Sequence, residues 1–312
     1  MEKRLEECRM DGILPLWKPK GLTSHDCVMK MRRIFQMKKI GHTGTLDPDA
    51  EGVLPICLGQ ATKIVPFLTD TKKTYIAACS LGRTTETEDA TGATVEEIVV
   101  EYPPSIEEIE AVLEQFNGEI VQIPPMYSAV KVNGRKLYEY ARANETVERP
   151  ERTVFIESLR IVPHELSGPN CFGLEIVCSK GTYIRTLCVD IGKMLGFPAH
   201  MAALERTKTG EFEKTNAITF EMLEEAKENG TLNKLLQSIE RGVTHLPVIQ
   251  VDNETKIRVK FGQKLPKPTE IIADQPYLIK HEDEILAVYQ MNPKNDEEIK
   301  PMRVFTEEQK SR

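Results

Sequence analysis

One carboxylate stands in a setting that suits chemistry. Asp47 lies in the segment GHTGTLDPDAEG (41–52), which contains three glycines, and Pro48 follows it directly. Glycine permits tight turns and close approach of a ligand, while proline stiffens the backbone beside the carboxylate. We therefore expect a rigid carboxylate in a cleft. The Asp-Pro pair equally fits a helix N-cap followed by a first-turn proline, and spacing alone leaves both interpretations open.

The elements before and after this loop must hold it in place. Residues 13–17 read as a strand, and Ser24 is a suitable N-cap for a basic amphipathic helix over 24–39. Apolar runs at 53–58 and 75–81 suit buried strands. The loop is thus expected between a helix and a buried strand.

Three further segments have recognisable patterns. The acidic segment 84–119 reads as a loop followed by a helix, and Pro124-Pro125 precedes a basic and aromatic stretch, 124–142. Residues 174–178 alternate as a strand. A helix after Gly181 has its apolar residues at 184–195 on one face, with Gly196 as its stop.

Charge is distributed unevenly along the chain. The net charge is −7, yet residues 84–130 hold 11 acidic side chains and no Lys or Arg, so the rest is net positive. Residues 1–75 carry 13 basic against 9 acidic side chains. Because a polyanion responds to a local basic face, a nucleic-acid partner is compatible with this pattern. Solvated faces without a partner are the alternative.

Composition indicates an ordinary globular protein, with 312 residues, 40% of them hydrophobic and 29% charged. The seven cysteines are scattered, odd in number and without a CxxC pair, so we expect a reduced compartment and no structural zinc. No stretch has the length of a membrane span. We expect a cytoplasmic protein. From Leu246 onward, short β-type runs alternate with turn residues, which predicts a small β domain after a boundary near residue 245.

Seven motifs in order resemble those of the bacterial tRNA pseudouridine-55 synthases, the TruB family. They are KPKGLTSHD (18–26), GHTGTLDPDAEGVLPICLG (41–59), KKTY (72–75), ETEDATG (86–92), PPMYSAVKVNG (124–134), GTYIRTL (181–187) and ALERTKTG (203–210). The resemblance implies an α+β fold: a mixed, mainly antiparallel sheet flanked by helices. It also implies a catalytic domain over 1–244 and a small C-terminal β domain, 245–312, similar to the PUA module.

The resemblance implies an activity as well. The family isomerises uridine 55 in the T-loop of tRNA by cleaving the glycosidic bond, rotating the uracil and rejoining it through C5. Asp47 would be the nucleophile, Arg185 would hold its carboxylate ionised and oriented, and Tyr75 would stack on the base or move a proton. Water must be excluded, since hydrolysis would release the uracil. No cofactor or metal is implied.

Further residues are implied to bind the substrate. Tyr183 and Leu204 would line the uridine pocket, and His42 would fill the space left by the flipped-out nucleotide. Asp89 would read a base edge, while Lys18, Lys20 and Lys131 would contact phosphates. Taken singly, each of these residues would pass as an ordinary structural or solvated side chain.

Two other functions compete with the synthase. One is a tRNA-binding or tRNA-folding protein with secondary catalysis. The other is a relative of the dyskerin group that needs a guide RNA and partner proteins; the acidic insert and compact C-terminus speak against it. We expect the tRNA T-arm as partner, no guide RNA, no membrane and a monomer. Tyr289 stands where the PUA pattern has a glycine, so the C-terminal part either contacts the tRNA acceptor end or only packs on the catalytic domain.

Overall fold

The computed structural model describes residues 10–269 and 275–305. The strands of its first 213 residues are β1 (Gly12–Lys18), β2 (Ile40–His42), β3 (Glu51–Leu58), β4 (Lys73–Leu81), β5 (Arg83–Thr85), β6 (Thr94–Glu97), β7 (Gly118–Gln122), β8 (Lys131–Val132), β9 (Arg135–Lys136), β10 (Arg152–Val162), β11 (Cys171–Cys178), β12 (Ala199–Thr209) and β13 (Phe212–Glu213). Towards the C-terminus follow β14 (Val248–Gln250), β15 (Leu265–Pro266), β16 (Tyr277–His281), β17 (Glu284–Asn292) and β18 (Asn295–Val304).

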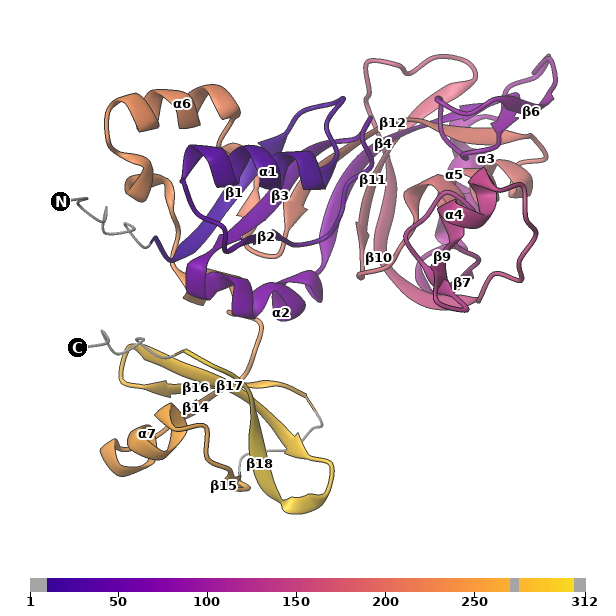
Figure 1. The fold of residues 1–312 in the computed structure, drawn as a ribbon. Coiled ribbons are helices and arrows are strands. Elements are labelled where there is room, and N and C mark those ends of the chain that lie inside the picture. Colours follow the sequence, from indigo (N-terminus) through magenta and orange to yellow (C-terminus); the bar gives the residue numbers. More distant parts are fainter. Residues whose placement is uncertain (1–9, 270–274, 306–312) are drawn as a thin grey trace.

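The helices cover parts of these sheets. They are α1 (Ser24–Ile34), α2 (Val65–Thr69), α3 (Ile106–Glu114), α4 (Leu137–Arg142), α5 (Ile184–Met194), α6 (Phe220–Glu228) and α7 (Asn253–Lys260). Short 3-10 helices are η1 (Gly59–Ile64), η2 (Lys214–Asn216), η3 (Leu232–Leu235) and η4 (Ile239–Gly242). Figure 1 shows α1 and α6 at one end of the large sheet, and α3, α4 and α5 at the other.

The large sheet has nine strands in the order β1-β3-β12-β4-β11-β10-β7, with β2 beside β3 and β13 beside β12. Neighbouring strands are antiparallel except β3 and β12, which run parallel. The predicted fold, a mixed and mainly antiparallel sheet flanked by helices, is therefore confirmed. At the parallel crossing the chains lie so close that a Cβ on Gly52 would come 2.2 Å from the carbonyl oxygen of Arg206. Only glycine fits there.

Apolar side chains bury the two halves of this sheet differently. Strands β1 and β3 are buried on both faces: Leu14 and Leu54 pack toward α1 and α6, whereas Ile13 and Val53 pack toward η1 and α2. Both strands therefore read as nearly continuous apolar runs. In the other half, alternate residues of β4, β10 and β11 face α3 and α5 and form a separate core. The predicted strands at 13–17, 53–58, 75–81 and 174–178 are all present.

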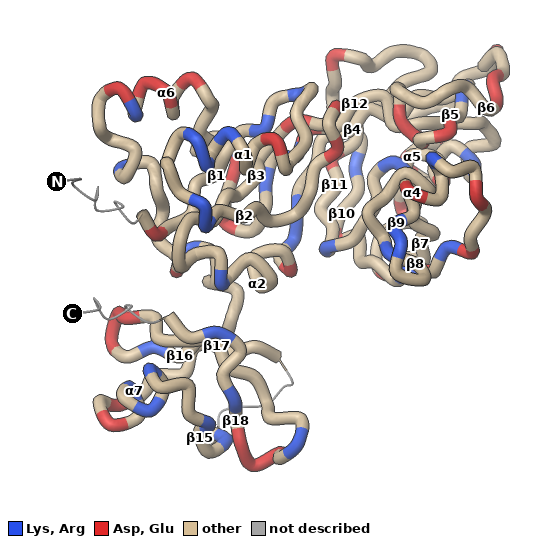
Figure 2. Tube along the Cα trace, in the orientation of Figure 1, with Lys and Arg blue, Asp and Glu red and all other residues tan. Residues whose placement is uncertain are grey.

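Helix α1 differs from its prediction at both ends. Its N-cap is Thr23 rather than Ser24, because Thr23 and Asp26 form a reciprocal capping box. The helix ends at Ile34, and Gln36 then adopts a left-handed φ of 51°. Lys38 and Lys39 therefore lie outside the helix. Figure 2 shows the basic residues along α1 beside the acidic residues of α6.

The other two predicted helices are present. The acidic segment contains the β5-β6 hairpin and then α3, whose N-terminus carries a capping box between Ser105 and Glu108. Helix α5 stops at Met194, and Gly196 has the left-handed φ of 84° that suits a helix end. Nothing in the residue pattern predicts β12, although it lies near the middle of the sheet.

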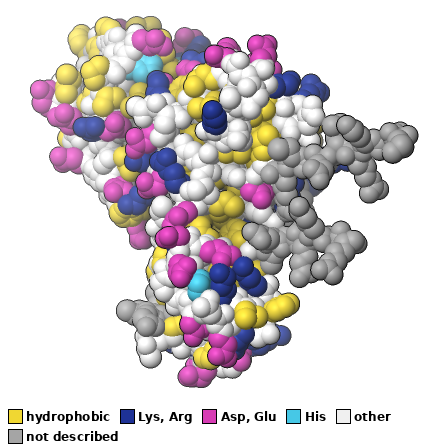
Figure 3. Space-filling view, turned by 90° about the vertical axis from the view of Figure 1, so that its left-hand side faces the viewer, with side chains coloured by type: hydrophobic (Ala, Val, Ile, Leu, Met, Phe, Trp, Pro, Cys, Tyr) yellow, Lys and Arg dark blue, Asp and Glu magenta, His cyan; other side chains and the backbone are white. Residues whose placement is uncertain are grey.

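The C-terminal part contains a five-stranded sheet in the order β14-β16-β17-β18-β15. It has a small core of its own, centred on Tyr289 and Ile299, and it touches the nine-stranded part through Leu278 and Val288. Figure 3 shows this part below the larger body. The domain boundary near residue 245 stays a prediction. No helix in the described segments is long and apolar enough to cross a membrane.

Candidate active site

The loop between β2 and β3 turns Asp47 into a cavity. The buried side chains of Leu46 and Ala50 flank Asp47 and anchor the loop in the core beneath it. The Ser24 hydroxyl exchanges hydrogen bonds with the backbone of Leu46, at 2.9 Å to its N–H and 3.2 Å to its carbonyl. The N–H of Ala50 donates to the Asp47 carbonyl at 3.2 Å, and β3 begins one residue later. The helix-cap interpretation of Asp47 is therefore wrong, since no helix follows it.

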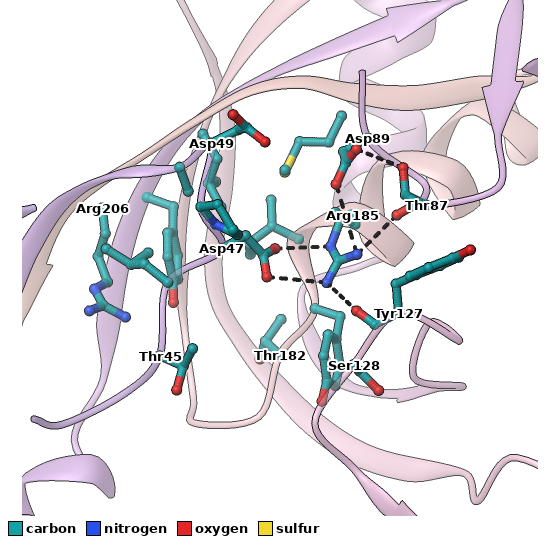
Figure 4. Close-up of a pocket in the computed structure, with 18 of the residues that line it drawn as sticks. Thr45, Asp47, Asp49, Thr87, Asp89, Tyr127, Ser128, Thr182, Arg185 and Arg206 are labelled. Carbon is teal, nitrogen blue, oxygen red and sulfur yellow. Dashed lines mark hydrogen bonds and ion pairs between the residues drawn. The ribbon is translucent and has the colours of Figure 1, made fainter. Parts of the chain in front are cut away.

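Arg185, in the first turn of α5, forms a two-point ion pair with Asp47. Its Nε lies 3.1 Å from Oδ2 of Asp47, and its Nη2 lies 3.4 Å from Oδ1. The arginine side chain is almost fully buried, with 7% of its surface exposed, whereas 40% of the Asp47 side chain is exposed. The pair thus has a fixed cation inside the protein and a carboxylate that opens to the cavity (Figure 4).

Backbone carbonyls hold the remaining donors of Arg185. Its Nη1 donates to the Thr87 carbonyl and its Nη2 to the Tyr127 carbonyl, each at 3.0 Å. A carboxylate oxygen of Asp89 lies 3.9 Å from Nη1. The other oxygen of Asp89 accepts hydrogen bonds from Thr87 and Thr91, at 2.6 to 2.9 Å. Asp89 therefore stabilises the loop that faces Arg185, and its contact with an RNA base stays a prediction.

Two opposing effects act on Asp47. Burial raises the pKa of its carboxyl, and the nearby Arg185 guanidinium lowers it, with the net direction upward. Asp89 and Asp49 add to the rise, and Lys18 opposes it. The carboxylate is therefore held near a cation in surroundings that weaken its solvation, as expected for a reactive carboxylate.

Tyr75 and Arg206 form one wall of the cavity. They are paired directly across β4 and β12, and the Arg206 guanidinium lowers the pKa of Tyr75 against the larger effect of burial. The buried guanidinium of Arg206 also donates from Nε to the Val53 carbonyl at 2.8 Å and from Nη2 to the Gly44 carbonyl at 2.9 Å. Arg206 thus joins the tyrosine to the loop that carries Asp47. Burial raises the pKa of Tyr75, which keeps its hydroxyl protonated at neutral pH.

The cavity has a volume of about 660 Å³, a size typical of sites for small molecules or single residues. The structure brings six predicted residues together, because all of them line it: Asp47, Arg185, Tyr75, Tyr183, Leu204 and Asp89. Tyr138 and Arg142 of α4 stand at the same cavity. No group of three or more possible metal-binding side chains occurs in residues 10–269 and 275–305.

Two family models match consecutive parts of the chain. The N-terminal domain of the TruB family pseudouridylate synthases matches residues 32–184, and the tRNA pseudouridylate synthase B C-terminal domain matches residues 185–244. A tRNA pseudouridine synthase B from Oceanobacillus iheyensis is 58% identical over 96% of this chain and 99% of its own length. The corresponding protein of Staphylococcus haemolyticus is 48% identical over 95% and 99%. This chain belongs to the TruB family of pseudouridylate synthases.

Solved structures agree with this family and with the fold. A chain of an H/ACA RNP bound to a substrate RNA containing 2′-deoxyuridine superposes with a TM-score of 0.71 at 26% identity, covering 95% of this chain and 85% of that one. A chain of a Cbf5–Nop10–Gar1 complex gives a TM-score of 0.72 at 29% identity, with 96% and 84% covered. Both likenesses extend into the C-terminal sheet.

Lys18 does not behave as expected for a phosphate contact in this TruB-family chain. Its side chain is fully buried, and its ammonium donates to the carbonyls of Pro19, Leu22 and Pro48 at 2.7 to 3.0 Å. A phosphate contact is incompatible with that burial, so the prediction is corrected. The Pro48 bond instead ties β1 to the loop that carries Asp47.

Three further predicted RNA contacts lie away from the cavity. Lys20 is half exposed and lies 3.5 Å from Glu51, and Lys131 is exposed on the β8-β9 hairpin. His42 lies on β2, where its buried Nδ1 has no hydrogen-bond partner in the described part of the chain. Burial and then Arg206 lower the pKa of His42, which favours the neutral ring. RNA contacts by these three residues stay predictions.

Two buried cations escaped the sequence-based prediction. Arg206 lies within ALERTKTG, two residues beyond Leu204, and period-2 spacing would have placed both on one face of a strand. Lys73, two residues before Tyr75, also lines the cavity, and its ammonium donates to the Thr69 and Thr71 carbonyls. Burial lowers the pKa of Lys73 to about 8. Each lies two residues from a side chain that lines the cavity, and that spacing is the signal that could have found them.

Proposed function

We propose that this protein converts uridine 55 in the T-loop of tRNA to pseudouridine, with Asp47 as nucleophile. Membership of the TruB family, with tRNA pseudouridine synthase B relatives up to 58% identical over almost the whole chain, makes it an isomerase that forms pseudouridine in tRNA. The site in the RNA and the residue that attacks are the parts that we propose.

One observation carries the choice of nucleophile. In the cavity, Asp47 is held at both oxygens by a buried arginine while 40% of its side chain remains exposed. A bidentate guanidinium fixes the carboxylate in orientation and favours its ionised form against the effect of burial. Asp49 lies in the same loop but is exposed and has no ion pair within the described ranges. Asp47 is therefore the carboxylate that is prepared for attack.

The proposed reaction is an isomerisation with no external reactant. Asp47 attacks C1′ of the ribose, the C1′–N1 bond breaks, and uracil keeps the electron pair while a C1′–Asp47 ester forms. The uracil turns so that C5 faces C1′, C5 displaces Asp47 and the new C–C bond forms. The proton on C5 then leaves, and N1 gains one. The products contain the same atoms as the substrate.

The cavity walls suit the detached uracil. The rings of Tyr75 and Tyr183, with the side chain of Leu204, give the base apolar surface on which to turn. Such walls also exclude water, and an ester or a free base open to water would be lost by hydrolysis. The Tyr75 hydroxyl is neutral, so it can give its proton to uracil N1 and, as the tyrosinate, take the proton from C5.

Reaching the cavity requires the uridine to leave its stack. Flipping a nucleotide out of a structured loop costs about a few kcal/mol, which backbone contacts must offset. Tyr138 and Arg142 at the cavity, and the exposed Lys131 of the same segment, are placed to make such contacts. We expect the monomeric chain to act on tRNA without a guide RNA, since its near-full-length similarity is to tRNA pseudouridine synthase B proteins.

Mapping the product tests both the site and the independence from a guide. The purified chain alone would be incubated with an unmodified tRNA transcript, and pseudouridine would be located by carbodiimide adduct formation and primer extension. We expect a single stop one nucleotide 3′ of position 55, and no product on a transcript in which that uridine is cytidine. Product at another position, or only when a guide RNA is added, would contradict the proposal.

A further inference from the structure

The loop 85–91 and helix α5 are joined at two consecutive positions on each side. Thr87 offers its carbonyl to Arg185, and the next residue, Glu88, accepts a hydrogen bond from the Thr186 hydroxyl at 2.7 Å. Thr186 is buried, as is Arg185. The residue beside the site's arginine thus anchors the loop that holds that arginine.

The backbone of Glu88 has a conformation unusual for a residue with a side chain. Its φ is 63°, in the left-handed region, where a Cβ crowds the following carbonyl. Its N–H donates to Thr85 and its carbonyl accepts from Met201 of β12. This turn directs the Thr87 carbonyl and the Asp89 carboxylate toward Arg185, while the Glu88 side chain reaches Thr186 (Figure 4 shows Thr87, Asp89 and Arg185).

We infer that Glu88 is a positioning residue, whose bond to Thr186 holds loop 85–91 against α5 and so fixes the guanidinium of Arg185 opposite Asp47. The inference rests on the proposed function, in which Asp47 attacks the ribose. If this turn had no further role, glycine or asparagine would adopt its left-handed backbone at lower cost than glutamate. Here the strain is retained together with a carboxylate that reaches the residue after Arg185.

The charges around Glu88 are consistent with an anchor. Burial raises the pKa of its carboxyl, Thr186, Arg185 and Arg149 lower it, and Asp190 raises it further. The net direction is upward, so ionisation of Glu88 depends on its partners. The Thr186 hydroxyl is the partner that makes a hydrogen bond, and removing it leaves a half-buried carboxylate without its donor.

A loosened Arg185 would affect Asp47 in a measurable way. Arg185 lowers the pKa of Asp47, against burial, Asp89 and Asp49, with Lys18 acting in the same sense as Arg185. If the guanidinium moves away, the pKa of Asp47 rises further. Fewer molecules then carry the ionised nucleophile at a given pH, and the acidic limb of the rate profile moves to higher pH.

The test compares Thr186→Val, which removes the donor at nearly constant shape, with Thr186→Ser, which keeps it. Single-turnover tritium release from T-loop RNA labelled at uridine C5 is followed between pH 5 and 8, with RNA binding and thermal unfolding measured on the same proteins. For Thr186→Val we expect a rate loss of about tenfold or more, an acidic limb shifted upward and unchanged RNA affinity. Thr186→Ser should keep the wild-type rate and the wild-type position of the acidic limb.

Variants of the loop give the matched comparison. Glu88→Gln keeps an acceptor oxygen and loses less rate than Glu88→Ala. Glu86→Ala, two residues away with an exposed side chain, leaves the rate and the limb unchanged. If Thr186→Val and Glu88→Ala lower only the melting temperature, with rate and limb intact, Glu88 has a structural role alone and the inference fails.

A second measurement separates this inference from the proposed function. The Asp47 carboxyl can be titrated by ¹³C NMR in wild type and Thr186→Val, which needs no turnover. A higher Asp47 pKa in the variant supports the positioning role even if the wild type releases no tritium, in which case the proposed function is what fails. Equal Asp47 pKa values in the two proteins would overturn the inference.

Discussion

The nine-stranded sheet and the C-terminal five-stranded sheet treat charge in opposite ways. In the first and in helix α5 packed against it, Lys18, Lys73, Arg206 and Arg185 are buried and donate to backbone carbonyls. In the second, no Lys, Arg, Asp or Glu of its described part is buried, and its cations form surface ion pairs such as Lys264 with Glu298. Burying a charge is costly unless it is paired and hydrogen-bonded.

The difference shows that the cost of burying charge is borne near Asp47 and not in the C-terminal sheet. The five-stranded sheet folds around Tyr289 and Ile299 with its charges outside. That sheet therefore folds without buried cations. Those around Asp47 hold the loop, the tyrosine and the carboxylate in place, and each can be tested against a counterpart that lies elsewhere.

The largest effect is expected at Arg185. In Arg185→Lys a single ammonium replaces the planar fork that meets both Asp47 oxygens and two carbonyls, so we expect the single-turnover rate to fall by about a hundredfold or more. RNA affinity measured by filter binding should stay within about twofold, because Arg185 is buried behind the nucleophile. The matched control is Arg160→Lys, in an exposed pair with Glu175 at 2.6 Å, which should leave the rate unchanged. Equal rate losses in both variants would contradict a special role for the buried arginine.

A tyrosine from each sheet gives the next comparison. Tyr75→Phe should keep RNA binding and lose most turnover, by about a hundredfold, if the hydroxyl moves a proton at C5. The buried Tyr289 hydroxyl donates to the Gln263 carbonyl at 2.7 Å, so Tyr289→Phe should cost about 1 kcal/mol of unfolding free energy without changing turnover. Near-normal turnover in Tyr75→Phe would limit that tyrosine to stacking.

The pH profile of the wild type should show the raised pKa of Asp47. The reactive form is the carboxylate, and burial shifts the pKa upward from 3.8. The rate should therefore rise about tenfold per pH unit below that raised pKa and level off above it. The acidic limb should lie at higher pH than an ordinary aspartate would give, in single-turnover assays at constant ionic strength. A flat rate profile from pH 4.5 to 8 would show that the pKa of Asp47 is not raised.

The smallest effect concerns stability alone. In Lys18→Met three backbone carbonyls lose their donor, which should cost about 1 to 3 kcal/mol of unfolding free energy in urea. Lys264→Met, at an exposed pair in the C-terminal sheet, should produce no measurable change. A Lys18→Met protein that is as stable as wild type but binds RNA more weakly would contradict this account. Lys18 would then contact the RNA instead of stabilising the fold.

Much of the fold follows from the residues alone. Continuous apolar runs predicted β1 and β3, and helical spacing with end signals predicted α3 and α5. Strand β12 did not follow, because Met, Ala, Leu and Glu have little strand preference, and its two neighbours in the sheet decide its conformation. The N-cap of α1 was missed by one residue because Thr23 and Ser24 are equally good caps until the Asp26 contact is known.

Site residues that lie in a recognised motif could be predicted. Residues whose role depends on how deeply the fold buries them could not. Asp47, Arg185 and Tyr75 came from motifs, and they do line one cavity. Lys18 was taken for a surface cation because its sequence neighbours, Pro19 and Lys20, suggest a surface turn, and only the fold buries it. Arg206 became visible when β12 placed it beside Tyr75.

Tritium release from uridine C5 of a T-loop stem-loop RNA tests the central claim most directly, with wild type, Asp47→Asn and Asp49→Asn compared. Asparagine keeps the shape of the side chain and removes its charge and nucleophilicity. We predict release by wild type, release within a few-fold by Asp49→Asn, none by Asp47→Asn, and RNA binding by all three. Release by Asp47→Asn at a rate near wild type, or no release by any of the three while all bind RNA, would contradict the account.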